Sequence, residues 1–110
     1  LLTTAPETHG DTVRSRNVCV FANGEIDRSP CGTGTSARLT QLYMKGVIRP
    51  GMKLEHHSII DTVFEAEAVR ETEVGGRRAV VPRVSGSAYI TAFSNFVLDE
   101  DDPLPNGFRL

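Results

Sequence analysis

The sequence contains no cluster of Lys and Arg, no apolar run of membrane-spanning length and no internal repeat. With a formal net charge of -2 over 110 residues, the chain has no electrostatic basis for attracting nucleic acid or an anionic membrane. Its first residues lack the charged and apolar parts of a signal peptide. We therefore predict a cytoplasmic, single-domain protein with no nucleic-acid partner and no membrane span.

Cysteine is also scarce, with Cys19 and Cys31 as the two examples. Two cysteines do not make a secreted disulfide framework, so both are predicted to be reduced thiols. Cys19 lies in an apolar run and is predicted to pack in the core. The pair His56-His57 could suggest a metal site, but neighbouring strand residues point to opposite faces and cannot easily chelate one ion. We predict structural or surface roles for these histidines and no metal site.

The first half of the chain predicts one helix after a loop. Residues 1–16 are polar and are predicted to be a loop, and residues 17–21 a short strand. The principal helix is predicted to run from about Thr33 to Lys45, because apolar residues recur there at helical spacing. Gly46 is a plausible C′ residue after its end.

The second half predicts strands. Residues 60–68 alternate with a period of two, as in a half-buried strand. One face carries Asp61, Glu65 and Glu67, and the other carries Ile60, Thr62, Phe64, Ala66 and Ala68. Gly75-Gly76 predicts a hairpin turn, and Pro82 confines the strand of residues 79–84 to an edge or an irregularity. Residues 88–98 are predicted to form a strand that is covered on both faces, because both faces are apolar. The fold class is therefore α+β, with one helix packed on or inside a curved, mostly antiparallel sheet.

Residues 27–36 combine three features that suit chemistry. Gly32 and Gly34 let a ligand approach the backbone, and the loop opens a helix whose first N–H groups favour an anion. Cys31 lies at that end, where a thiolate is stabilised, and Asp27 could reach the same cavity and bind a cationic amine. On these features alone, we favour a Gly-rich helix start with a structural cysteine, because short Gly motifs often arise by chance.

The run of residues 27–38, DRSPCGTGTSAR, resembles the signature of the proline racemase family. That family includes proline racemases, 4-hydroxyproline 2-epimerases and trans-3-hydroxyproline dehydratases. Weaker resemblance extends through residues 58–60, 63–64, 84–88 and 98–103. The resemblance implies a fold like that of diaminopimelate epimerase, in which two similar domains, each a curved sheet around a central helix, hold the substrate between them. It covers the carboxy-terminal part of the family's pattern.

The resemblance also implies a mechanism without a cofactor, in which one cysteine removes the α-proton and another delivers one. Cys31 matches the second of these cysteines. Gly32 and Thr33 match the positions whose amides hold the substrate carboxylate, and Asp27 matches the carboxylate that holds the ring nitrogen. Cys19 lacks flanking glycines and does not match the first cysteine. The chain is thus expected to be a truncated piece with half an active site, inactive alone, and a homodimer as the complete enzyme.

Three hypotheses follow for the function. The first is a racemase or epimerase that inverts the α-carbon of proline or hydroxyproline, with proline favoured. The second is a 3-hydroxyproline dehydratase, but dehydratases that resemble this sequence usually carry Thr at the position of Cys31. The third is a non-catalytic domain that binds a carboxylate at the helix end. Phe21 is predicted to be a core residue, although the resemblance places it where an aromatic lines the substrate ring.

Overall fold

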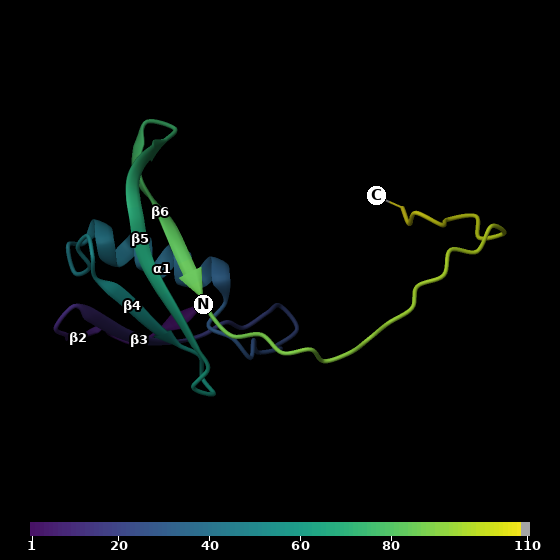
Figure 1. Ribbon diagram of the computed structural model, residues 1–110, viewed down its shortest axis with the longest axis horizontal. Coiled ribbons are helices and arrows are strands. Elements are labelled where there is room, and N and C mark those ends of the chain that lie inside the picture. Colours follow the sequence, from purple (N-terminus) through teal and green to yellow (C-terminus); the bar gives the residue numbers. More distant parts are fainter. Residues whose placement is uncertain (109–110) are drawn as a thin grey trace.

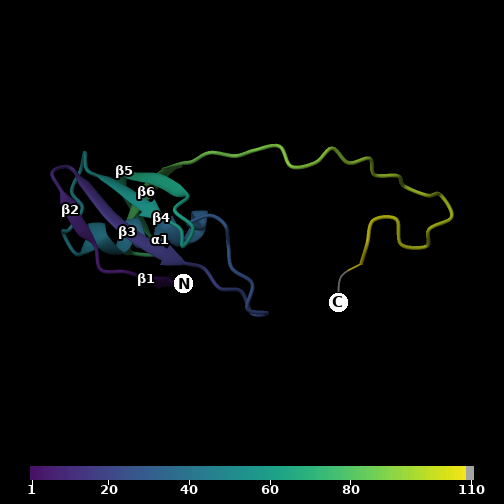
Figure 2. The same cartoon turned by 90° about the horizontal axis from the view of Figure 1, so that it is seen from below.

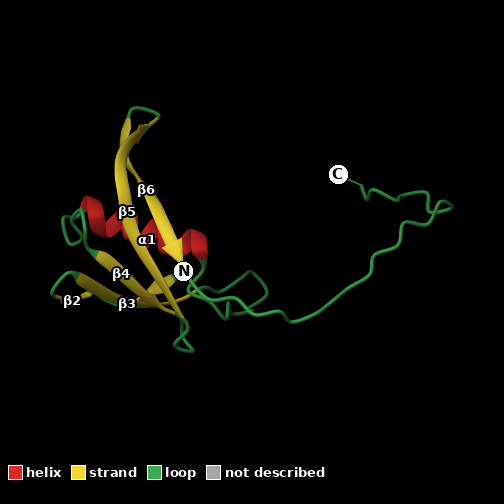
Figure 3. Cartoon of the chain, in the orientation of Figure 1, coloured by secondary structure: helices red, strands yellow, loops and turns green. Residues whose placement is uncertain are grey.

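A computed structural model describes residues 1–108 of the chain. In chain order its elements are β1 (Leu2–Thr3), β2 (Glu7–His9), β3 (Thr12–Val18), α1 (Gly32–Met44), β4 (Lys53–His57), β5 (Val63–Val74) and β6 (Arg77–Ser85). The strand order is β1-β3-β4-β5-β6, and β2 also pairs with β3. The β3–β4 pair is parallel, whereas the other pairs are antiparallel. Figures 1 and 3 show a curved sheet around one helix, which is the predicted α+β fold.

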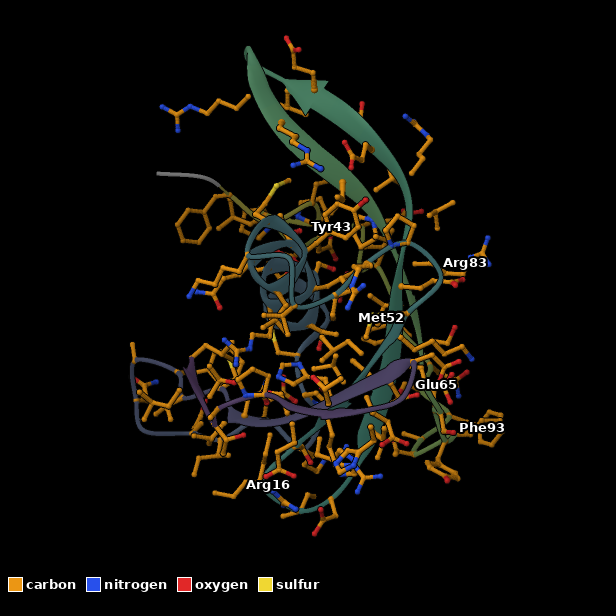
Figure 4. The ribbon with its side chains drawn as sticks, turned by 90° about the vertical axis from the view of Figure 1, so that its left-hand side faces the viewer. Arg16, Tyr43, Met52, Glu65, Arg83 and Phe93 are labelled. Carbon is orange, nitrogen blue, oxygen red and sulfur yellow. The ribbon has the colours of Figure 1, made fainter. Side chains whose placement is uncertain are left out.

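Helix α1 supplies much of the core. Leu39 and Leu42 are buried, and Tyr43 lies between the helix and the β5–β6 hairpin (Figure 4). The buried apolar cluster consists of Val13, Leu39, Leu42, Tyr43, Ile48, Leu54, Ala66 and Val80. The predicted helix and its buried face are therefore confirmed. No helix among residues 1–108 is long and apolar enough to cross a membrane.

The helix ends as the sequence predicts. Gly46 has a φ of 71°, and its amide donates to the Tyr43 carbonyl at 2.9 Å. The Val47 amide donates to the Leu42 carbonyl at 3.0 Å. These two bonds form a Schellman motif, which needs a left-handed residue at the C′ position.

Replacing Gly46 with alanine should lower the free energy of unfolding by about 1 kcal/mol, because a Cβ atom is disfavoured at this φ. Lys45→Ala is the matched control, since Lys45 has a right-handed φ of -81°. Urea denaturation of both variants measures the difference. Equal stability of the two variants would contradict the strained-turn account.

The β5–β6 hairpin also follows the sequence pattern. Its two-residue turn is Gly75-Gly76, both with positive φ, as a type I′ turn requires. On β5 the inward residue Ala66 is buried, whereas Glu65 is exposed. Pro82 lies in β6, which is the last strand of the sheet, so its missing N–H leaves no interior ladder position unpaired.

The prediction of a loop over residues 1–16 is wrong, because this segment forms β1, β2 and most of β3. The inward residues of β3 are Val13, Ser15 and Asn17, and two of them are polar. Ser15 Oγ lies 3.0 Å from Thr3 Oγ1, and Asn17 donates to a backbone carbonyl. Because these inward side chains are polar and are satisfied by hydrogen bonds, the segment lacks the apolar alternation by which a strand is predicted from sequence.

The predicted strand over residues 17–21 is only partly correct, because β3 ends at Val18. Beyond it, Val20 forms an isolated antiparallel bridge with Ile26, and Phe21 is 52% exposed. The prediction of Phe21 as a core residue is therefore wrong. The chain turns here because the Gly24 amide closes a tight turn onto the Phe21 carbonyl at 2.9 Å.

The predicted strand over residues 60–68 begins three residues late, at Val63. A turn occupies the preceding residues, and the Ser58 amide donates to the Thr62 carbonyl at 2.8 Å across it. Ile60 is consequently 60% exposed rather than inward. Asp61 adopts a φ of 63° in this turn, a conformation that a strand does not allow.

The predicted strand over residues 88–98 is absent. This segment extends away from the folded body in Figures 1 and 2, and Phe93 lies apart from the core in Figure 4. Tyr89 and Phe93 are 86% and 94% exposed. Apolar side chains on both faces indicate that a segment would be buried, but a strand also needs a neighbouring backbone, and residues 1–108 provide none for it.

Candidate functional site at the start of α1

Cys31 is the N-cap residue of α1, directly before the first helical residue, as predicted. Its Sγ accepts a hydrogen bond from the Gly34 amide at 3.4 Å, and its carbonyl accepts from the Thr35 amide at 2.8 Å. Cys31 has a φ of 65°, which is uncommon for a residue other than glycine. With this positive φ the chain turns into the helix, and the thiol is half-buried.

The amides of Gly32 and Thr33 follow directly after the thiol. Neither amide has a hydrogen-bond acceptor among residues 1–108. Apart from its chain neighbours and the helix backbone, no atom lies within 4 Å of the position that a Cβ at Gly32 would occupy. Two free N–H groups at a helix N-terminus favour an anion, and the open space at Gly32 allows one to approach the backbone.

Asp27 is held beside this helix start by the preceding hairpin. Its amide donates to the Cys19 carbonyl at 3.1 Å, next to the Val20–Ile26 bridge. Its Oδ1 accepts from the Ser29 amide at 2.9 Å and from Ser29 Oγ at 3.0 Å. Ser29 Oγ in turn accepts from the Cys31 amide at 3.1 Å, so one serine links the carboxylate to the thiol residue.

Cys19 joins the same cluster, which is not among the positions predicted from the sequence. Its Sγ, the Cys31 Sγ and a carboxylate oxygen of Asp27 all lie within 4.8 Å of one another, and all three residues are half-buried. Desolvation raises the pKa of the Cys19 thiol, and the neighbouring Cys31 thiol and Asp27 carboxylate raise it further. The prediction that Cys19 belongs to the core is not borne out by this position at the site.

A buried polar network packs against the loop that precedes α1. Asn17 Nδ2 donates to the Pro30 carbonyl at 2.6 Å, and Thr35 Oγ1 lies 3.0 Å from His56 Nδ1. His56 is fully buried, so desolvation lowers its pKa to about 4, and the charges of Arg38 and His57 act in the same direction. The ring is thus neutral near neutral pH. It contacts Thr35 in the first turn of the helix that Cys31 caps.

The two histidines do lie on opposite faces of β4, because His56 is buried and His57 is half-buried. Among the residues that the structure describes, the one cluster of metal-ligating side chains is Cys19, Asp27 and Cys31, without histidine. A signal for this cluster was present in the sequence. The turn residues 22–25 imply that their flanking residues pair, which brings Cys19 beside Asp27.

The arrangement gathers a thiol, two free amides and a carboxylate at one helix end. The amides suit a carboxylate group, the acid suits a cationic amine, and the thiol lies beside both. An amino acid carries these two charged groups on its α-carbon. The geometry can therefore bind an amino acid with a thiol close to its α-carbon, and the residues predicted from sequence, Cys31, Gly32, Thr33 and Asp27, do lie together.

The chain is similar in sequence to known proteins. The family model described as proline racemase matches residues 1–109. The proline racemase of Clostridioides difficile is 54% identical over 95 residues, which cover 86% of this chain and 28% of the relative. The trans-3-hydroxy-L-proline dehydratase of Burkholderia ambifaria is 48% identical over 108 residues, which cover 98% of this chain and 32% of the relative.

A solved structure is similar in shape as well. The crystal structure of a hydroxyproline epimerase from Agrobacterium vitis, with bound trans-4-OH-L-proline, matches with a TM-score of 0.70 and 37% identity. The match covers 96% of this chain and 30% of that one. The chain thus spans about a third of the length of the relatives that it matches. The family model extends over nearly every residue of the chain, and the chain therefore belongs to the proline racemase family.

Proposed function

We propose that this chain carries one half of the active site of a cofactor-independent racemase or epimerase that inverts the α-carbon of proline or hydroxyproline. The observation that carries the proposal is the Cys31 thiol beside the unpartnered amides of Gly32 and Thr33. In this proposal, the second thiol and the other wall of the pocket come from outside these 110 residues, and the complete enzyme is a homodimer.

Each residue has a distinct role in the proposed reaction. The Gly32 and Thr33 amides hold the substrate carboxylate, and Asp27 holds the ring nitrogen. Removal of the α-proton builds negative charge next to the carboxylate, where the amides and the helix end stabilise it. Cys31 acts as acid or base on one face of the α-carbon, and the second thiol acts on the other face. A base on each face lets the reaction run in both directions without reorienting the substrate.

Two alternatives remain within reach of the same site. A 3-hydroxyproline dehydratase would not need to reprotonate the second face, so the presence of a thiol at position 31 favours inversion over loss of water. A non-catalytic domain would use only the amides. Proline is favoured over 4-hydroxyproline as substrate. The hydroxyproline bound to the Agrobacterium vitis epimerase supports 4-hydroxyproline as the alternative substrate.

The test uses the complete protein that contains this chain. It is incubated separately with L-proline, trans-4-hydroxy-L-proline and trans-3-hydroxy-L-proline, and the products are separated by chiral chromatography. We expect D-proline to accumulate until the two enantiomers are equal in amount. Faster inversion of 4-hydroxyproline would favour the epimerase, loss of water from 3-hydroxyproline the dehydratase, and binding without turnover the non-catalytic domain. The 110-residue chain alone should be inactive, and turnover by it at the rate of the complete enzyme would overturn the two-thiol mechanism.

Asp27→Asn in the complete enzyme should lower kcat/KM for the preferred substrate by about 10- to 100-fold, mainly through KM. Asparagine can still accept the Ser29 hydrogen bonds through its Oδ1, but it cannot pair with a cationic amine. Glu25→Gln is the control, because it removes an exposed carboxylate from the same hairpin. Equal losses in both variants would indicate a general charge effect instead of a contact with the substrate.

A further inference from the structure

The cluster of Cys19, Asp27 and Cys31 has the composition of a metal site. Its three donor atoms lie within 4.8 Å of one another, and they come from the hairpin of residues 19–27 and from the helix cap. Thiolate sulfurs bonded to Zn²⁺ at about 2.3 Å lie about 3.8 Å apart in a tetrahedral site. The two sulfurs would therefore need to approach each other by about 1 Å at most.

The backbone already holds these donors in place. The hairpin is closed by the Asp27–Cys19 hydrogen bond at 3.1 Å and by a bond from the Phe21 amide to the Glu25 carbonyl at 2.9 Å. Asp27 uses its Oδ1 to accept from Ser29, and its Oδ2 has no donor among residues 1–108. One carboxylate oxygen thus stays available to a cation without loss of the bonds that fix the loop.

We propose that Cys19, Asp27 and Cys31 bind a thiophilic divalent cation of the Zn²⁺ class, with the fourth position open to water. Two sulfur ligands select Zn²⁺ or Cd²⁺ over Mg²⁺ and Ca²⁺, which prefer oxygen alone. Binding replaces the S–H protons with bonds to the metal and releases those protons to solvent. The charge of the two thiolates and the carboxylate offsets that of the cation.

A cation at this position would occupy the Cys31 sulfur. If Cys31 is the base of the proposed reaction, the metal would remove that base, and a chelator would restore it. This consequence for activity rests on the proposed function, whereas binding itself does not. Cys19 is then the residue that makes the enzyme sensitive to metal, because it adds a second sulfur next to the first.

The experiment titrates the complete protein with Cd²⁺ under a reductant that does not bind metals. Cadmium–thiolate bonds absorb in the ultraviolet, so binding is read without an activity assay. We expect one Cd²⁺ per chain with the absorption of two thiolates. Cys19→Val should bind at least tenfold more weakly, since even the loss of a residue that supports a ligand costs that much. Glu25→Gln, in the same hairpin, should bind like the parent protein.

Unchanged Cd²⁺ affinity in C19V would overturn the proposal. The metal would then bind either between Cys31 and a thiol outside these 110 residues or at a different site. Circular dichroism checks that the variant folds, and C19S, which keeps the size of the side chain, replaces it if it does not. Zn²⁺ should inhibit the parent enzyme more strongly than C19V. If the protein binds Cd²⁺ through Cys19 but does not invert proline or hydroxyproline, the proposed function is wrong and the metal site is supported. If it inverts the substrate but does not bind Cd²⁺ through Cys19, the metal site is wrong and the proposed function is supported.

Discussion

Cys31→Ser in the complete enzyme is expected to lower the rate of proline racemisation by about 10³-fold. The serine hydroxyl is far too weak an acid to cycle as a base near neutral pH, whereas a thiol at a helix N-terminus can. Substrate binding should survive, because the amides of Gly32 and Thr33 and the carboxylate of Asp27 do not depend on the sulfur. Racemisation is followed by chiral chromatography and binding by calorimetry.

Exchange of the α-proton with solvent deuterium gives a sharper reading of the same variant. With the thiol at position 31 removed, the second thiol can still take the proton from one enantiomer, while the opposite enantiomer should not exchange. The two enantiomers thus serve as controls for each other in one protein. Exchange of both at the parent rate would show that Cys31 is no base, and the structural role for this cysteine would then stand.

Acidification from about pH 6.5 to pH 4 should destabilise the chain through His56 by up to about 3 kcal/mol. The folded state keeps this buried ring neutral, with its pKa lowered to about 4 from an ordinary 6.5. Between these values the unfolded chain binds more protons, so the free energy of unfolding falls as the pH drops. The stabilisation is fully present above pH 6.5 and is lost as the pH approaches 4.

Urea denaturation of the 110-residue chain at several pH values measures this slope, and His56→Gln should flatten it. His9→Gln is the matched control, because it removes an exposed histidine of β2. Carboxylates contribute in a different range. Arg14 lowers the pKa of Glu55 and Arg16 that of Asp61, so their contributions are lost below about pH 4. A slope that persists between pH 6.5 and 4 in His56→Gln would assign the effect to another group.

The sequence was sufficient for elements whose stability is local or apolar. The helix, its Schellman end at Gly46 and the Gly75-Gly76 hairpin each depend on a few adjacent residues with known preferences. Of the candidate site, the cap position of Cys31 and the nearness of Gly32 and Thr33 follow from their place before a helix. Their roles in catalysis stay predictions that the experiments above address.

Features held by polar contacts between distant segments were not predictable in the same way. Strand β3 buries Ser15 and Asn17 through hydrogen bonds, and His56 reaches the site from a strand 25 residues beyond Cys31 in the chain. Composition and periodicity do not report such partners. Residues 88–98 fail for a different reason. Their apolar pattern predicts burial, but it does not identify the surface against which they would pack.

The parallel pairing of β3 with β4 governs the order in which the candidate site can form. These strands are joined by residues 19–52, which contain the hairpin, Cys31 and all of α1. Parallel strands cannot pair until such a crossover connection is in place, and pairings that close long stretches of chain form slowly. The contact of His56 on β4 with Thr35 beneath the cysteine loop depends on that closure. A synthetic peptide of residues 19–45 would therefore contain every predicted site residue and still lack the site.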